Sequence, residues 1–149
     1  MVISVLISVK CMIISVKILA RRKKMRGNDN FGELLGINVL EVKSGYAKIS
    51  LKINKNHLNF SGFVHGGVIF ALADCAFAEA SNSDRQAVAV QVNINYIRPS
   101  SEGDTLTAEA SRVSEGKTFS LFKVTVTKEE KMIALFSGLA YNLPSDKAT

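Results

Sequence analysis

The sequence predicts an α+β fold in which a curved antiparallel sheet of five to six strands wraps around one long central helix. The first observation behind this prediction is a helix-like stretch, about His65 to Ser81, whose residues 68–80 are apolar on every side except at Asp74 and Glu79. A helix that is apolar all round is normally covered on most of its faces. The second observation is that strand-like segments follow this helix one after another, at residues 88–96, 105–113, 119–127 and 132–141.

The residues before the central helix predict a short helix and then a hairpin. The short helix is expected over residues 28–36, with Asn28 or Asn30 as its cap and Gly36 as its stop. Two strand-like runs then flank a Lys-Ser-Gly turn, at residues 37–42 and 46–53. A polar loop leads on to the central helix, and its His57 is expected at the surface.

The alternation in the first strand after the helix predicts which side chains share a face. Five larger side chains recur at every second position and are expected to point one way: Val88, Val90, Val92, Ile94 and Tyr96. The smaller and polar side chains between them, from Ala89 to Asn95, point the other way. One face of this strand therefore meets the helix, and Arg98-Pro99 ends the strand.

Composition and charge favour one domain and exclude a nucleic-acid binder. A chain of 149 residues with 47% hydrophobic residues can form a single core without disulfides or a metal. The net charge of +6 lies within residues 1–30, which hold seven basic side chains and one acidic one. The remaining residues are neutral, with twelve of each sign, so they offer no basic face for phosphates. Cys11 and Cys75 lie far apart and indicate reduced thiols in a cytoplasmic protein, and no Cys/His spacing indicates a metal site.

The N-terminal residues 1–24 form an apolar and basic extension before a domain at 25–149. Two lysines interrupt residues 1–20, so no uncharged run approaches the ~20 residues that span a bilayer, and a membrane partner is not expected. A signal peptide is not expected either, because the basic cluster follows the apolar run. Three interpretations stay open: an added strand or helix, an interfacial anchor, or a leader that arises from a start codon placed too far upstream.

Asp74 is the unusual residue of the central helix. A buried carboxylate is costly unless it is hydrogen-bonded or paired, so it has either a function or a structural partner. Glu79 is a poor substitute, because five residues turn it about 140° away around the helix. Cys75 is expected to pack in the core.

Several blocks of sequence together resemble one family. The central block is His-Gly-Gly-Val-Ile-Phe-Ala-Leu-Ala-Asp-Cys-Ala-Phe-Ala, which starts at His65, with Asn59 six positions before it. Asn-Tyr-Ile-Arg-Pro and Gly-Asp-Thr-Leu-Thr-Ala-Glu-Ala follow it. Over residues 31–142 the chain resembles the hotdog-fold acyl-CoA thioesterases of the PaaI-like, phenylacetate-degradation group. The resemblance implies hydrolysis of acyl-CoA thioesters to free acid and CoA, with no metal or redox cofactor and with coenzyme A only as part of the substrate.

The glycines that open the helix suit a thioester carbonyl. Free N–H groups in a first helical turn, helped by the helix dipole, stabilise a developing oxyanion, so we expect the carbonyl at Gly66 and Gly67. Asp74 lies eight residues beyond Gly66, roughly 12 Å along the helix axis, and cannot reach that carbonyl. If both groups act on one substrate, Asp74 comes from a second subunit.

The resemblance implies a role for each of these residues. Asp74 acts as nucleophile or as general base, and the sequence does not choose between the two. Asn59 positions the thioester or the lytic water. His65 either orients the loop through its imidazole or makes a structural hydrogen bond to the backbone. Ala89 stands where some relatives place a water-holding Ser or Thr. The implied assembly is a homodimer at least, with dimers pairing into a homotetramer.

The remaining candidates concern the substrate. Aromatic side chains near the helix are candidate walls of the acyl pocket: Phe60, Phe63, Phe70 and Phe77. Arg98 is either a ligand of a coenzyme A phosphate or a surface arginine. A non-catalytic acyl-CoA-binding or regulatory module on the same fold is the alternative function. A hotdog hydratase is disfavoured, because the helix carries no pair of His with Asp or Glu.

Overall fold

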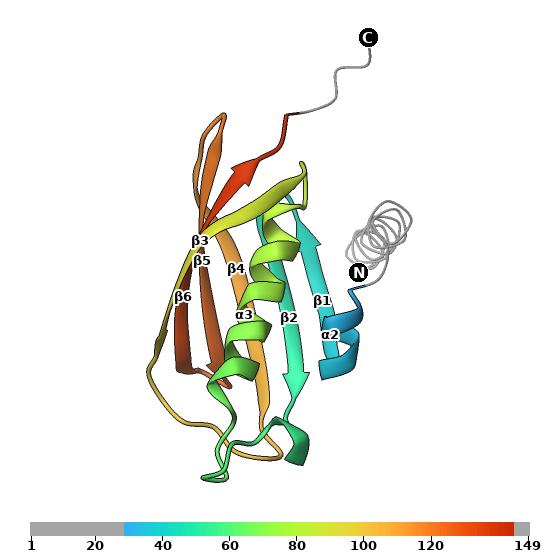
Figure 1. Ribbon diagram of the computed structural model, residues 1–149, viewed down its shortest axis with the longest axis vertical. Helices are drawn as coiled ribbons and strands as arrows, with labels where there is room; N and C mark the ends of the chain where they lie inside the picture. The colour runs from blue at the N-terminus through green and yellow to red at the C-terminus, as the bar shows by residue number, and fades with distance from the viewer. Residues whose placement is uncertain (1–28, 145–149) are drawn as a thin grey trace, which may run out of the picture. The chain divides into compact units, whose positions relative to one another are not determined.

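Six antiparallel strands form one sheet, and the long helix α3 (Gly66–Ser81) packs against one of its faces (Figure 1). The computed structural model describes residues 29–144, so the predictions for residues 1–24 lie outside it. The strand order is β1-β2-β4-β5-β6-β3. The bounds are β1 Ile37–Lys43, β2 Tyr46–Lys52, β3 Ala87–Tyr96, β4 Thr105–Glu115, β5 Phe119–Lys128 and β6 Lys131–Asn142. The predicted α+β fold is confirmed.

The predicted short helix and hairpin are also present. Helix α2 (Asn30–Leu35) stops at Gly36, whose φ of 78° is a conformation that favours glycine. Strands β1 and β2 pair through a turn in which Gly45 has a φ of 68°. The loop after β2 contains the 3₁₀ turn η1 (Lys55–His57).

His57 corrects the expectation of a surface residue, because it is 4% exposed. Its Nδ1 accepts a hydrogen bond from the Asn54 N–H at 3.2 Å, which closes a capping box around η1. Its carbonyl accepts from the His65 N–H at 2.8 Å. His57 therefore connects the loop to the residue that precedes α3.

Helix α3 buries one side against the sheet and leaves the other partly exposed. Its buried side consists of four alanines, two larger aliphatic side chains and one aromatic ring: Ile69, Ala71, Leu72, Ala73, Ala76, Phe77 and Ala80. The ring of Phe77 lies 5.5 Å from that of Phe122 and 5.7 Å from that of Phe136, centroid to centroid. Gly138 of β6 makes room for it, since a Cβ there would lie 2.9 Å from the Phe77 ring. Phe77 is therefore a core residue, which corrects its place among the candidate pocket walls.

A β-bulge in β3 overturns part of the predicted alternation. Val92, Ile94 and Tyr96 pair with Gly138, Phe136 and Ala134 of β6, which are buried on the α3 side of the sheet. The register shifts between Ala89 and Gln91, so that Ala89 pairs with the buried Ala140. Since a bulge adds one residue, the side chains before it change face. Val88 is about half exposed and does not share the face of Val92, and Val90 lies within the bulge and is also about half exposed.

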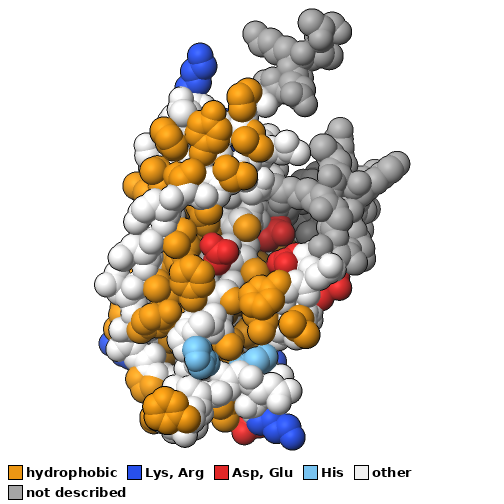
Figure 2. Space-filling view, in the orientation of Figure 1, with side chains coloured by type: hydrophobic (Ala, Val, Ile, Leu, Met, Phe, Trp, Pro, Cys, Tyr) orange, Lys and Arg blue, Asp and Glu red, His pale blue; other side chains and the backbone are white. Residues whose placement is uncertain are grey.

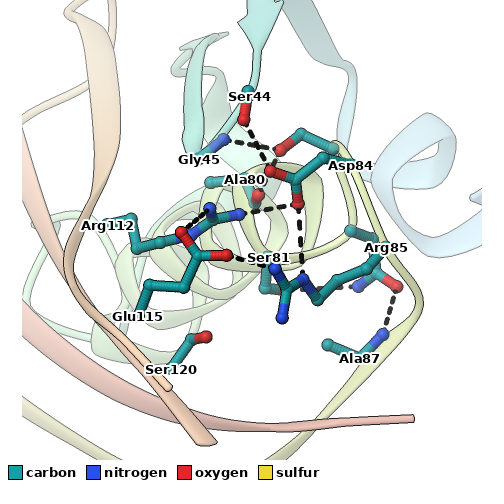
Figure 3. A network of polar contacts seen from close by, with 12 residues as sticks. Ser44, Gly45, Ala80, Ser81, Asp84, Arg85, Ala87, Arg112, Glu115 and Ser120 are labelled. Carbon is teal, nitrogen blue, oxygen red and sulfur yellow. Dashed lines mark hydrogen bonds and ion pairs between the residues drawn. The ribbon is translucent and has the colours of Figure 1, made fainter. Parts of the chain in front are cut away.

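A network of ion pairs and hydrogen bonds joins the C-terminal end of α3 to the hairpin turn and to β4 (Figure 3). Ser83 Oγ donates to the Ala80 carbonyl at 2.7 Å and accepts from the Gly45 N–H at 2.7 Å. Arg112 of β4 bonds Asp84 at 2.7 Å, and Ser44 also donates to that carboxylate. Burial alone would raise the pKa of Asp84, but the hydrogen bonds from Arg112 and Ser44, with the charges of Arg112 and Arg85, outweigh it and lower that pKa.

No helix within residues 29–144 is long and apolar enough to span a membrane.

Candidate active site

An open groove of about 370 Å³ lies where the loop before α3, the first turn of α3 and the end of β3 meet. Its walls are mostly apolar, with an amide, a phenol and a guanidinium among them: Asn59, Phe63, Val64, Gly66, Ile69, Tyr96, Ile97, Arg98 and Pro99. A largely apolar concave surface with a few polar groups is the usual form of a small-molecule site. The groove brings together four of the predicted site residues, Asn59, Phe63, Gly66 and Arg98.

Among residues 29–144, one N–H group of the first turn of α3 has no recorded acceptor. The N–H groups of Val68 and Ile69 both donate to the His65 carbonyl, at 2.9 and 3.3 Å. The Gly67 N–H donates to His65 Nδ1 at 2.9 Å. Within the described residues, no acceptor is recorded for the N–H of Gly66, and Gly66 lines the groove. This N–H is therefore free to donate to an oxygen of a bound molecule.

The position of His65 corrects the expectation that both glycine amides face a carbonyl. Its imidazole caps α3 by accepting the Gly67 N–H, so that this amide already has an acceptor. Gly67 and His65 are exposed, and neither lines the groove. Of the two interpretations left open for His65, the structure contains the hydrogen bond from imidazole to backbone.

Asn59 faces the groove with its amide group already oriented. Its Oδ1 accepts from the N–H groups of Ser61 at 2.9 Å and Phe63 at 3.2 Å. These two bonds assign the oxygen to the loop, so Nδ2 is the end that remains. No acceptor is recorded for Nδ2 within residues 29–144. Asn59 can therefore donate to a carbonyl or a water in the groove.

The candidate substrate-binding residues divide between the groove and the core. Phe63 is 46% exposed and lines the groove. Arg98 also lines it, and its Nη1 donates to the Met132 carbonyl at 2.8 Å, which holds the guanidinium at the end of the groove wall. Phe70 lies elsewhere: its ring packs edge-on against Phe136 with centroids 5.9 Å apart, on the margin of the core.

Asp74 does not line the groove. It lies two helical turns beyond Gly66, roughly 12 Å along the axis of α3. Asp74 is half-buried, whereas the sequence predicted a buried carboxylate. Figure 2 shows hydrophobic side chains gathered on the α3 side of the molecule with acidic side chains among them.

Tyr96 is a polar residue of the groove that was not among the predicted site residues. We expected it only as the last of a series of strand residues on one face. The structure places its hydroxyl 3.1 Å from the Gly66 carbonyl. The signal in the sequence was its position two residues before the Arg-Pro that ends the strand. Nothing local shows that this strand end meets the start of α3.

Among the described residues, no group of three or more His, Cys, Asp or Glu side chains could hold a metal ion.

The comparisons with known proteins point to one family. The model of the Thioesterase superfamily matches residues 61–134. A putative esterase of Archaeoglobus fulgidus is 44% identical over 124 residues, which cover 82% of this chain and 80% of that protein. Acyl-coenzyme A thioesterase PaaI of Escherichia coli is 36% identical over 121 residues, 80% of this chain and 86% of that protein.

Solved structures agree with these sequence matches. The structure of E. coli PaaI, from the phenylacetic acid degradation operon, superposes with a TM-score of 0.81 and 34% identity over 88% of this chain and 96% of that one. The Streptococcus mutans protein smu.793, solved with acetyl CoA bound, gives a TM-score of 0.70 and 29% identity over 74% of this chain and 91% of that one.

Proposed function

The chain belongs to the thioesterase superfamily, with the hotdog fold of the PaaI-like proteins, and we propose that it hydrolyses acyl-CoA thioesters to the free acid and CoA in the groove at the start of α3. The observation that carries the proposal is the Gly66 N–H, which has no acceptor within the described residues and lines a mostly apolar groove. A thioester carbonyl in the groove would accept this N–H, and the helix dipole would favour the negative charge that develops on its oxygen.

In this proposal, each groove residue contacts a different part of the substrate. Asn59 Nδ2 donates to the carbonyl or to the attacking water. Phe63 contacts the acyl group, and Phe70 does so only from the margin of the core. Arg98 faces a phosphate of coenzyme A, since a guanidinium binds phosphate well. The binding of acetyl CoA by the S. mutans relative supports a coenzyme A thioester as the ligand.

Asp74 supplies the base or the nucleophile from a second copy of the chain. As a base, it takes a proton from water, the water attacks the carbonyl carbon, and the C–S bond breaks to release the CoA thiolate. As a nucleophile, its carboxylate attacks the carbonyl carbon, the C–S bond breaks to release the CoA thiolate, and water hydrolyses the resulting anhydride to the free acid and the Asp74 carboxylate. In both routes the carboxylate must lie at a carbonyl that Gly66 of the other copy holds, because about 12 Å separates the two residues within one chain.

The exposed edge of the sheet at β3 supports this dimer. Strand β3 lies at one edge of the sheet, and Val88 and Val90 on it are about half exposed. An edge strand with exposed apolar side chains is a ready surface for pairing with another chain. We propose a homodimer as the active unit, with two dimers forming a homotetramer, in the cytoplasm, where cysteine side chains such as Cys75 stay reduced.

The first test is thiol release from a panel of acyl-CoAs by wild type and Asp74→Asn. The panel contains phenylacetyl-, hydroxyphenylacetyl- and benzoyl-CoA and straight chains of several lengths, and we expect turnover of at least one aryl thioester. Asp74→Asn should lower kcat by about 10²- to 10⁴-fold, because it removes the base or nucleophile. The matched control is Glu79→Gln, which neutralises the other carboxylate of the same helix. This variant should keep kcat within about twofold of wild type, because residue 79 lies about 140° around the helix from residue 74.

Each contrary result has a definite meaning. A wild type that binds acyl-CoA but hydrolyses none of the panel would make the protein an acyl-CoA-binding module. If a folded Asp74→Asn variant had full activity, the protein would still be a thioesterase, but Asp74 would be neither its base nor its nucleophile.

A further inference from the structure

Tyr96 occupies a defined place at the junction of β3 and α3. It is the last residue of β3 and pairs with the buried Ala134 of β6, so its side chain lies on the α3 side of the sheet. The bulge between Ala89 and Gln91 lies earlier in the strand and does not alter this face. Tyr96 is 53% exposed because its ring forms a wall of the groove.

The ring and the hydroxyl of Tyr96 both contact the first turn of α3. The hydroxyl donates to the Gly66 carbonyl at 3.1 Å. A Cβ on Gly66 would lie 3.4 Å from the carbon that carries the hydroxyl, which is van der Waals contact, so the ring lies directly against this part of the helix. The Tyr96 ring is therefore held against the same residue whose N–H is available in the groove.

Two side chains together hold the glycine pair. Glycine has more backbone freedom than any other residue, so a first turn made of Gly66 and Gly67 is intrinsically weakly restrained. His65 fixes this turn from one side by accepting the Gly67 N–H. Tyr96 fixes it from the other side through the Gly66 carbonyl. A donor aimed at a developing charge is effective only when its direction is fixed in advance.

We propose that Tyr96 is a positioning residue, which holds the first turn of α3 so that the Gly66 N–H keeps its direction into the groove. This inference rests on the proposed function, because it assigns the N–H to the thioester carbonyl. It is distinct from that function in naming the phenol of β3 as the group that orients the donor. The phenol itself donates to the backbone and takes no part in proton transfer.

The test compares Tyr96→Phe with Tyr46→Phe. Each variant removes one hydroxyl group that donates a hydrogen bond of 3.1 Å. The Tyr46 hydroxyl, on β2, donates to Glu109 on β4, and neither residue lines the groove. Tyr96→Phe keeps the ring in the groove wall, so KM should stay within about twofold while kcat falls about tenfold, as expected when only transition-state binding is lost. Tyr46→Phe should change neither constant by more than about twofold.

Amide hydrogen exchange gives a second readout that needs no turnover. In Tyr96→Phe the amides of residues 68–70 should exchange about fivefold faster, because the first turn loses one hydrogen bond that anchors it to the sheet. In Tyr46→Phe their exchange should stay as in wild type. A wild type without thioesterase activity would overturn the proposed function, yet the exchange rates would still show whether Tyr96 holds the turn. Unchanged exchange, or an unchanged kcat in an active enzyme, would overturn the positioning role.

Discussion

At the residue scale, the proposed chemistry depends on one N–H group, and its position in the helix allows that group to be deleted cleanly. Gly66 is the first residue of α3, with His65 as the N-cap. Proline is well tolerated at this first position, because the N–H there has no partner within the helix. His65 has a φ of −62° and a ψ of 135°, which is the conformation that a residue before proline prefers.

Gly66→Pro should therefore lower kcat by about 10²- to 10³-fold while the fold is retained, because it removes the oxyanion donor. The measurement is steady-state thiol release together with thermal unfolding. Gly66→Ala is the matched control, because it keeps the N–H group. The methyl group that it adds would lie 3.4 Å from the Tyr96 ring, which is van der Waals contact. A Gly66→Pro variant that unfolds like wild type and keeps its activity would exclude this N–H from the reaction.

At the element scale, the C-terminal end of α3 is stabilised by charge. Arg112 is 12% exposed and bonds both Asp84 and Glu115, so it connects the loop after α3 to β4 (Figure 3). The pKa of Asp84 in the folded protein is lower than its ordinary value of 3.8. A carboxyl with a lowered pKa adds stability above its unfolded-state pKa, and this stability is lost as the pH falls through the folded-state pKa.

Asp84→Asn should lower the free energy of unfolding at pH 7 by about 1 kcal/mol, a small effect because water screens a side chain that is partly exposed. The difference between wild type and variant should shrink as the pH falls below about 4, since wild type then loses the same ion pair. Urea unfolding at several pH values measures this difference. Glu102→Gln removes the same charge at an exposed position that takes part in no recorded ion pair among residues 29–144, and it serves as the control. A difference that stayed constant down to pH 2 would contradict the ion-pair explanation.

At the scale of the whole molecule, the proposed site requires two copies of the chain. Each copy offers Gly66 and the groove at one point of α3, and Asp74 roughly 12 Å further along. A shared site predicts that two inactive variants restore activity to each other when they are mixed. The chain with Gly66→Pro still supplies Asp74, and the chain with Asp74→Asn still supplies Gly66.

Refolding the two variants together should restore about a quarter of the wild-type activity, because random pairing makes half of the dimers mixed and each mixed dimer has one intact site. Each variant refolded alone should remain inactive, and light scattering should show the same assembly for all samples. If mixed dimers show no recovery of activity, the model in which Gly66 of one chain and Asp74 of the other form one site is wrong.

The sequence by itself determined the fold and several residues of the groove, because those signals are local. The apolar helix, the glycine stop at Gly36 and the successive strands are all periodic or turn patterns within short stretches. The block from Asn59 to Asp74 could be compared with a family without knowing the fold in space. For the same reason Asn59, Phe63 and Gly66 could be proposed from sequence as site residues, and all three line one groove.

Only the tertiary structure decided which atoms of these residues remain available. The Gly67 N–H already donates to the His65 imidazole, and Phe77 is buried in the core. The bulge in β3 moves Val88 to the other face of the sheet. The contact of Tyr96 with Gly66 joins residues thirty positions apart. Such facts depend on which distant segments pack together and which of their groups form hydrogen bonds. The local sequence pattern does not show which distant residues will be in contact.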